Sequence, residues 1–153
     1  MPGSIDVIAI DGPSGSGKST IAKELSKRLG IAYLNTGAMY RAVTLYLLDD
    51  DLLEPLRLER NGIEKILQGI TIDVSGETVL LNGKDISEQT RSEKVTAEVS
   101  FVSSIPEVRR FLVEQQRRIA RKGRYVLEGR DIGTNVFPDA KFKFFLTADA
   151  SER

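Results

Sequence analysis

The residues best suited to chemistry lie near the amino terminus, in the segment Gly12-Pro13-Ser14-Gly15-Ser16-Gly17-Lys18-Ser19. Its spacing matches G-x-x-x-x-G-K-[ST], in which glycines let several backbone N–H groups point at one spot. Those N–H groups and the positive end of a following helix can cradle a phosphate. In this pattern Lys18 reaches the outer phosphates of a nucleotide, and the Ser19 hydroxyl can ligate Mg2+. The segment therefore predicts a phosphate-binding loop.

The elements on either side of this loop must hold it in place. Residues 5–10 form a short apolar run rich in β-branched side chains, as expected of a buried strand. After the loop, apolar residues recur at helical spacing: Ile21, Ala22, Leu25 and Leu29. Strand, glycine-rich loop and helix in this order support the phosphate-binding interpretation.

Composition limits the chemistry that is available. The chain has 153 residues, with 22 Lys+Arg, 22 Asp+Glu, no cysteine and no histidine. A net charge of zero gives no sign of a nucleic-acid or membrane partner. Thiolate and imidazole chemistry are excluded, so a reaction must use lysine, arginine, carboxylates, hydroxyls and a bound metal. No apolar run has transmembrane length and no signal peptide is evident, so we expect a cytoplasmic protein.

Two further helices are expected before the middle of the chain. Thr36 is predicted to cap the first, which has an apolar stripe of Met39, Val43, Tyr46 and Leu47 and ends at Asp49-Asp50-Asp51. The second is predicted from Leu58 to Leu67.

The middle of the chain changes character. β-formers at 70–74 and 78–81 are separated by Ser75-Gly76-Glu77 and followed by Asn82-Gly83, a strong hairpin signal. We predict a small antiparallel sheet inserted in an α/β chain.

The last third is expected to return to alternating helices and strands. Helical segments are predicted at 93–102 and, after a capping box at Ser104-Ile105-Pro106-Glu107, on to about Arg121. Strands are predicted at 125–127 and 142–146, the first parallel to the opening strand. Ser151 is predicted to cap another helix. The overall prediction is an α/β fold with a parallel sheet.

Three more polar clusters lie where open α/β sheets place their ligands. They are Thr36 to Arg41, Arg109, and the glycine-rich segment Glu128 to Thr134. A second anion site beside the phosphate loop suggests transfer between two phosphate-bearing molecules, which needs no histidine. The alternatives are that Arg41 and Arg109 are surface arginines and that Glu128 and Asp131 are turn residues. Basic residues at 117–124 could likewise form an anion patch or a solvated helix end.

Three motifs together resemble bacterial cytidylate kinases, over the whole chain. They are residues 12–20, the segment Asn35-Thr36-Gly37-Ala38-Met39-Tyr40-Arg41, and the segment from Glu128-Gly129-Arg130-Asp131 to Asp139. The resemblance implies a three-layer P-loop kinase fold and phosphorylation of CMP or dCMP by ATP with Mg2+. It also implies a core of residues 1–41 and 105–153, and a monophosphate-binding region at 42–104 with a β-rich insert at about 69–88. We expect a monomer.

The same resemblance implies roles for individual residues. ATP phosphates would be held by Gly12, Pro13, Ser14, Gly15, Ser16, Gly17, Lys18, Ser19 and Thr20. The sugar and phosphate of CMP would meet Thr36, Tyr40, Arg41 and Arg130, and the base would meet Ser100, Arg109 and Asp131. Lys18, Arg130 and Asp131 are the expected catalytic residues. A carboxylate that accepts from an amino group and an arginine that donates to ring acceptors suit cytosine better than uracil.

One feature of the family is missing from this sequence. The resemblance implies a further lid segment whose arginines close over the phosphates, and we expect that the chain is truncated before it. Three alternatives stay open: another P-loop small-molecule kinase, a nucleotide-binding fragment without turnover, and a GTPase. The last would need an N-K-x-D motif, which Asn82-Gly83-Lys84-Asp85 does not match.

Overall fold

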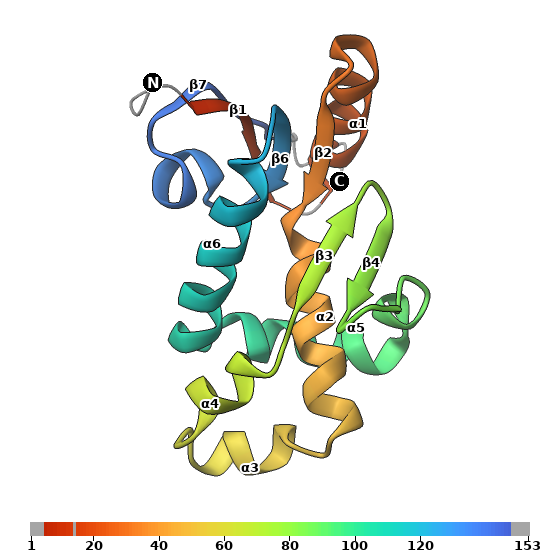
Figure 1. Ribbon diagram of the computed structural model, residues 1–153, viewed down its shortest axis with the longest axis vertical. Coiled ribbons are helices and arrows are strands. Elements are labelled where there is room, and N and C mark those ends of the chain that lie inside the picture. Colours follow the sequence, from red (N-terminus) through yellow and green to blue (C-terminus); the bar gives the residue numbers. More distant parts are fainter. Residues whose placement is uncertain (1–4, 14, 148–153) are drawn as a thin grey trace. The chain divides into compact units, whose positions relative to one another are not determined.

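The structure, a computed structural model, describes residues 5–13 and 15–147 (Figure 1). The chain divides into two compact units. The first unit contains residues 1–36 and 116–153, and the second contains residues 37–115. The predicted division at 41/42 and 104/105 separates a nucleotide-binding core from a monophosphate-binding region, and it stays a prediction.

In the described part of the first unit, four strands form a parallel sheet in the order β2-β6-β1-β7. Their bounds are β1 Ile5–Asp11, β2 Ala32–Asn35, β6 Tyr125–Gly129 and β7 Ala140–Phe145. The carboxyl ends of parallel strands meet at one edge of a sheet, so the segments that follow β1 and β6 start side by side. The predicted α/β class, parallel sheet and antiparallel insert are confirmed.

Helix α1 (Lys18–Leu29) packs against β2 and β6. Ala22 is fully buried and contributes to a cluster with Ile10, Tyr33 and Val126. Ile21 and Leu29 belong to the same predicted apolar stripe, yet they are exposed by 42% and 55%. Only part of the helical pattern therefore faces the sheet.

The second unit contains most of the helices. They are α2 (Thr36–Asp49, whose first residue belongs to the first unit), α3 (Leu53–Leu58), α4 (Ile63–Gln68), a 3-10 turn (Gln89–Arg91), α5 (Glu93–Ser103) and α6 (Pro106–Ala120, which continues into the first unit). The predicted end of α2 at the aspartate run is confirmed. The predicted helix from Leu58 to Leu67 is wrong, because the chain breaks at 59–62, where Gly62 has φ 83°.

Two predicted helix caps are also wrong. Helix α2 begins at Thr36 itself, whose hydroxyl donates to the Glu128 carbonyl at 2.8 Å. Helix α6 begins at Pro106, so Ser104 lies two residues before it and donates to Phe101 instead. Neither residue occupies the N-cap position, which is the residue directly before the first helical residue.

All of residues 37–115 are described, and within them three short strands form an antiparallel sheet in the order β3-β4-β5. The strands are β3 (Ile72–Ser75), β4 (Thr78–Leu81) and β5 (Lys84–Asp85), the first two drawn as arrows in Figure 1. The β4–β5 turn has positive φ at Asn82 (50°) and Gly83 (82°), the conformation that an Asn-Gly hairpin requires. This confirms the predicted insert.

Across the described residues, no helix combines the length and apolar character needed to cross a membrane. The helix cap predicted at Ser151 lies outside the described residues.

Candidate functional site

The turn after β1 has the backbone that an anion-binding loop needs. Gly12, Gly15 and Gly17 have φ values of 155°, 80° and 86°. A β-carbon on Gly12 would lie 2.5 Å from the Leu146 carbonyl oxygen, so a larger residue would not fit there. Gly17 is the N-cap of α1, and the unpaired N–H groups of the first helical turn follow it. Ser14 lies outside the described residues.

The Lys18 side chain lies over this loop and donates to the Pro13 carbonyl at 3.3 Å. Burial is the largest influence on its ammonium group and lowers the pKa of Lys18 below the ordinary 10.5. The charge of Arg130 also lowers this pKa, whereas Glu128 and, more weakly, Asp11 raise it. Two cations and two carboxylates thus lie within electrostatic reach of one another, and a bound phosphate would favour the charged form of Lys18.

A buried carboxylate lies beside the phosphate loop. Glu128, the penultimate residue of β6, is only 2% exposed. The Ser19 hydroxyl lies 2.7 Å from both of its carboxylate oxygens and donates to them, and the Tyr33 hydroxyl donates to Oε1. Because β2 and β6 are neighbours, the sheet itself brings Tyr33 to this carboxylate. Partners of this kind are what a buried charge requires.

The oxygen atoms of Ser19 and Glu128 suit a Mg2+ ion. Among the described residues, no group of three carboxylate side chains could form an all-protein metal cage. Mg2+ prefers one or two protein oxygens together with water and substrate phosphates. One hydroxyl and one carboxylate beside a phosphate loop therefore fit such an ion.

The segment after β6 forms the second polar loop. Arg130 is exposed and Asp131 is half-buried, and the π-helical turn Ile132–Val136 follows them. Asn135 Nδ2 donates to one carboxylate oxygen of Asp131 at 3.2 Å. Since β6 pairs with β1, this loop and the phosphate loop leave adjacent strands.

Arg117, at the end of α6, holds the far end of that turn. Its Nε donates to the Val136 carbonyl at 3.0 Å, and its Nη2 donates to the Asn135 carbonyl at 3.1 Å. Arg117, one of the basic residues at 117–124, therefore binds the backbone of the protein itself. The two interpretations offered by the sequence, an anion patch and a solvated helix end, did not include this role.

Two residues predicted to meet the acceptor lie at the start of α2. The Tyr40 side chain is half-buried. Arg41 Nη1 donates to the Thr90 carbonyl at 3.1 Å and to the Thr96 hydroxyl at 3.0 Å. These contacts orient the guanidinium group of Arg41 from two neighbouring elements of the second unit.

The predicted site residues are divided between the two units. The first unit holds the phosphate loop with Lys18 and Ser19, the buried Thr36, and Arg130 with Asp131. The second unit holds Tyr40, Arg41, Ser100 on α5 and Arg109 on α6, the last two exposed. The structure thus brings the phosphate loop together with the Arg130–Asp131 loop, and Arg41 together with Thr90 and Thr96. The binding roles themselves stay predictions.

Sequence reasoning missed two residues at this edge of the sheet. Asp11 ends β1 and accepts from the backbone N–H groups of Ile132 and Gly133, and Tyr33 binds Glu128 as described above. A polar residue that ends an apolar strand directly before the glycine-rich loop was the available signal for Asp11. No local signal points to Tyr33.

Comparison with known proteins gives a consistent result. A family model described as "Cytidylate kinase" matches residues 8–153. A cytidylate kinase of Chlorobaculum tepidum is 52% identical over 147 residues, a match that covers 96% of this chain and 63% of that protein. A cytidylate kinase of Caldanaerobacter subterraneus is also 52% identical over 147 residues, covering 95% of this chain and 64% of that protein.

A longer relative contains the same region. It is a bifunctional pantoate ligase/cytidylate kinase of Prochlorococcus marinus, 49% identical over 152 residues, with 96% of this chain and 29% of that protein covered. The chain spans slightly less than two thirds of the two shorter relatives described above.

Proposed function

Because the chain belongs to the cytidylate kinase family, we propose that the protein containing it transfers the γ-phosphoryl group of ATP to CMP or dCMP. The products are ADP and CDP or dCDP. One observation carries the proposal most directly: the phosphate loop and the Arg130–Asp131 loop leave adjacent parallel strands of one compact unit. A transfer reaction needs its donor site and its acceptor site held next to each other in a fixed relative position.

On the donor side, the loop N–H groups and Lys18 bind the ATP phosphates. Phosphoryl transfer depends on positioning and on positive charge around the moving group, and Lys18 and Arg130 supply that charge from this unit. Ser19 and Glu128 would hold Mg2+, which, when bound, neutralises charge on the phosphate oxygens. The hydrogen bond from Ser19 to Glu128 directs the hydroxyl proton to the carboxylate and leaves the oxygen lone pairs for a cation.

On the acceptor side, Arg41 and Arg130 bind the monophosphate, with Thr36 and Tyr40 next to the sugar. The base is bound by Ser100, Arg109 and Asp131. A carboxylate has about four lone-pair sites, so Asp131 can accept from Asn135 and from the cytosine amino group together. Uracil would place a carbonyl oxygen against the same carboxylate, and buried groups left unpaired in this way discriminate strongly.

A substrate panel tests the proposal. The full-length gene product, with ATP and Mg2+, is assayed for ADP release with CMP, dCMP, UMP and AMP. We expect turnover with the two cytidine nucleotides and much less with the others. Lys18→Ala abolishes it, while Lys27→Ala, a change on the exposed last turn of the same helix, serves as the matched control.

The 153-residue chain itself is expected to bind nucleotide without useful turnover, because the closing arginines expected from the family act mainly on the transition state. Calorimetry with CMP and an ATP analogue, run beside the ADP assay, measures both properties. Turnover at the full-length rate would contradict this part of the proposal. We further propose a cytoplasmic monomer, which sedimentation and fractionation of the full-length protein would test.

A further inference from the structure

Asp11 is a buried carboxylate to which sequence analysis gave no role. It ends β1 directly before the phosphate loop and is 5% exposed. Its two oxygens accept from two consecutive backbone N–H groups: Oδ1 from Ile132 at 2.7 Å and Oδ2 from Gly133 at 2.8 Å. Both distances are at the short end of the range for N–H donors, as expected when the acceptor is charged.

These N–H groups belong to the beginning of the turn that follows Arg130 and Asp131. The turn comprises Ile132–Val136, and its first N–H groups have no partner earlier in the turn. The Asp11 carboxylate supplies that partner from a strand 121 residues away along the chain. It therefore acts as a tertiary N-cap, which fixes where the turn starts and so where the two preceding side chains are placed.

The backbone around Asp11 strengthens the connection. Gly12 N–H donates to the Gly129 carbonyl at 3.2 Å, and Leu146 N–H donates to the Asp11 carbonyl at 2.8 Å. A β-carbon on Gly129 would lie 2.6 Å from Thr36 Oγ1, so the Thr36 side chain packs directly against the backbone at Gly129 and leaves no room for a larger residue. The start of the phosphate loop and the start of the Arg130–Asp131 loop are thus connected by hydrogen bonds of two neighbouring residues, Asp11 and Gly12.

We infer that Asp11 is a positioning residue for phosphoryl transfer: it fixes Arg130 and Asp131 relative to Lys18 and so sets where the acceptor nucleotide lies. Lys18 follows the loop after β1 and Arg130 directly follows β6, and these two strands are paired, so both cations lie at the same edge of the sheet. We assign Asp11 a positioning role because both of its carboxylate oxygens already accept from backbone N–H groups of the turn. This inference rests on the proposed function, since it assigns Asp11 a part in the same reaction.

Asp11→Asn tests it, because asparagine keeps the shape but turns an amide NH2 group toward one of the two N–H donors. In the full-length gene product, we expect KM for CMP to rise about tenfold or more, since a shift of about 1 Å is costly. KM for ATP should stay within about twofold, and the preference for CMP over UMP should narrow as Asp131 moves. A purely structural role would reduce the active fraction and lower kcat for both nucleotides, with KM values and base preference unchanged. That result would overturn the inference.

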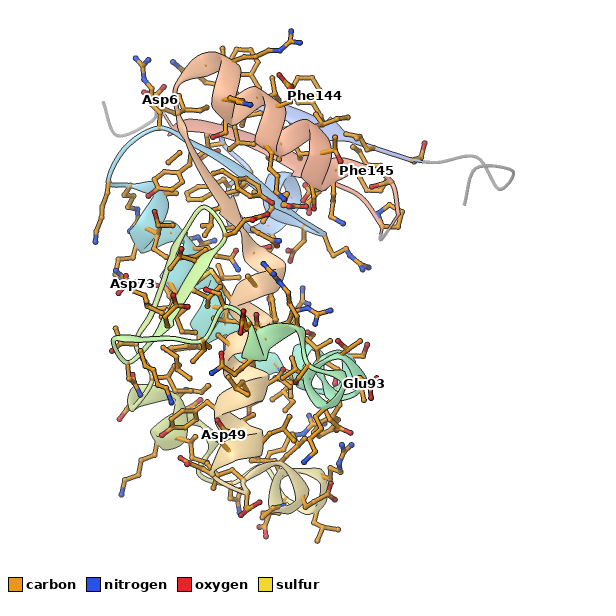
Figure 2. The ribbon with its side chains drawn as sticks, turned by 90° about the vertical axis from the view of Figure 1, so that its right-hand side faces the viewer. Asp6, Asp49, Asp73, Glu93, Phe144 and Phe145 are labelled. Carbon is orange, nitrogen blue, oxygen red and sulfur yellow. The ribbon has the colours of Figure 1, made fainter. Side chains whose placement is uncertain are left out.

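Asp6→Asn is the matched control. Asp6 lies on the same strand, at the end opposite the phosphate loop (Figure 2), and forms exposed ion pairs with Arg124 at 3.6 Å and Lys141 at 3.4 Å. Surface pairs of this kind contribute little, so both KM values should stay at the wild-type level.

Two further measurements keep the inference testable if Asp11→Asn folds poorly. Asp11→Glu keeps both oxygens but is one methylene longer, so it should displace the turn and raise KM for CMP in the same way. In the wild-type protein without ligand, hydrogen exchange at the Ile132 and Gly133 amides should be slowed at least about a hundredfold relative to an open chain. Unprotected amides would contradict the contact on which the inference depends. If the wild type phosphorylates no cytidine nucleotide, the proposed function fails, while the exchange result still decides whether Asp11 holds the turn.

Discussion

Two regions of the first unit reverse the usual relation between residue type and burial. At the carboxyl ends of β1 and β6, Asp11 and Glu128 are 5% and 2% exposed. On β7, the three phenylalanines are exposed by 56% (Phe142), 51% (Phe144) and 67% (Phe145). Carboxylates are ordinarily the exposed residues and phenylalanines the buried ones.

The difference lies in the partners that each region has. Each carboxylate has two donor groups that replace water, which are backbone N–H groups for Asp11 and hydroxyls for Glu128. β7 is the last strand in the sheet order and, among the described residues, pairs only with β1; Figure 2 labels Phe144 and Phe145 near its end. The two carboxylates are therefore held in place by hydrogen bonds without any ligand, whereas the described chain leaves the phenylalanines of β7 uncovered.

The largest expected effect comes from the polar region. Lys18→Met should reduce turnover of the full-length protein by several orders of magnitude, because no other lysine lies on the phosphate loop. The fold should survive, since burial lowers the pKa of Lys18 and its charge is therefore unfavourable in the folded chain. Near-normal kcat/KM in a folded variant would remove Lys18 from the mechanism.

The same variant makes a prediction about pH. Between the lowered pKa of Lys18 and its ordinary 10.5, the unfolded chain binds more protons than the folded chain. The free energy of unfolding contributed by this group therefore rises with pH across that window. Lys18→Met should lose this rise, which urea unfolding at several alkaline pH values would measure.

A smaller effect concerns base preference. Asp131→Ala should lower kcat/KM for CMP about ten- to a hundredfold, the value of a hydrogen bond to a charged partner, and should lower it much less for UMP. Asp139→Ala, on an exposed aspartate further along the same motif, is the matched control. Equal losses for both nucleotides would mean that Asp131 orients the site without contacting the base.

The buried carboxylate can be tested through its donors. Tyr33→Phe removes one hydroxyl from Glu128 and should lower the free energy of unfolding by about 1–3 kcal/mol. In a double-mutant cycle with Glu128→Gln, the two losses should be clearly non-additive. Additive losses, measured by urea unfolding, would show that the two side chains are not coupled.

The smallest expected change in folding stability is on β7. Replacing Phe142, Phe144 and Phe145 together by serine should change the free energy of unfolding by only about 0.5 kcal/mol per site and should reduce self-association of the 153-residue chain. Sedimentation velocity measures the association. Phe137→Ser is the contrast, because this side chain is 5% exposed and its loss should cost about 3–5 kcal/mol. Unchanged association in the triple variant would show that the exposed strand is not the contact surface.

Sequence by itself determined the features that depend on neighbouring residues. The phosphate loop, the strand before it and the Asn82-Gly83 hairpin follow from local backbone preferences, since glycine and asparagine accept positive φ where few residues do. The family could be predicted from motifs of this kind, and the match over residues 8–153 confirmed it.

Tertiary structure alone decided which side chains those motifs meet. Ser19 and Glu128 are 109 residues apart, and Asp11 and Gly133 are 122 apart, so no local pattern could join them. The Thr36 hydroxyl likewise donates to the Glu128 carbonyl, 92 residues away, a partner that spacing along the chain cannot identify. The miss at Ser104 has a local cause, because this residue is the C-cap of α5 and donates to Phe101, three residues earlier, and α6 begins only at Pro106. Burial is again set by tertiary structure, through the neighbouring strands and their order, which is why two acids are enclosed while three phenylalanines are exposed.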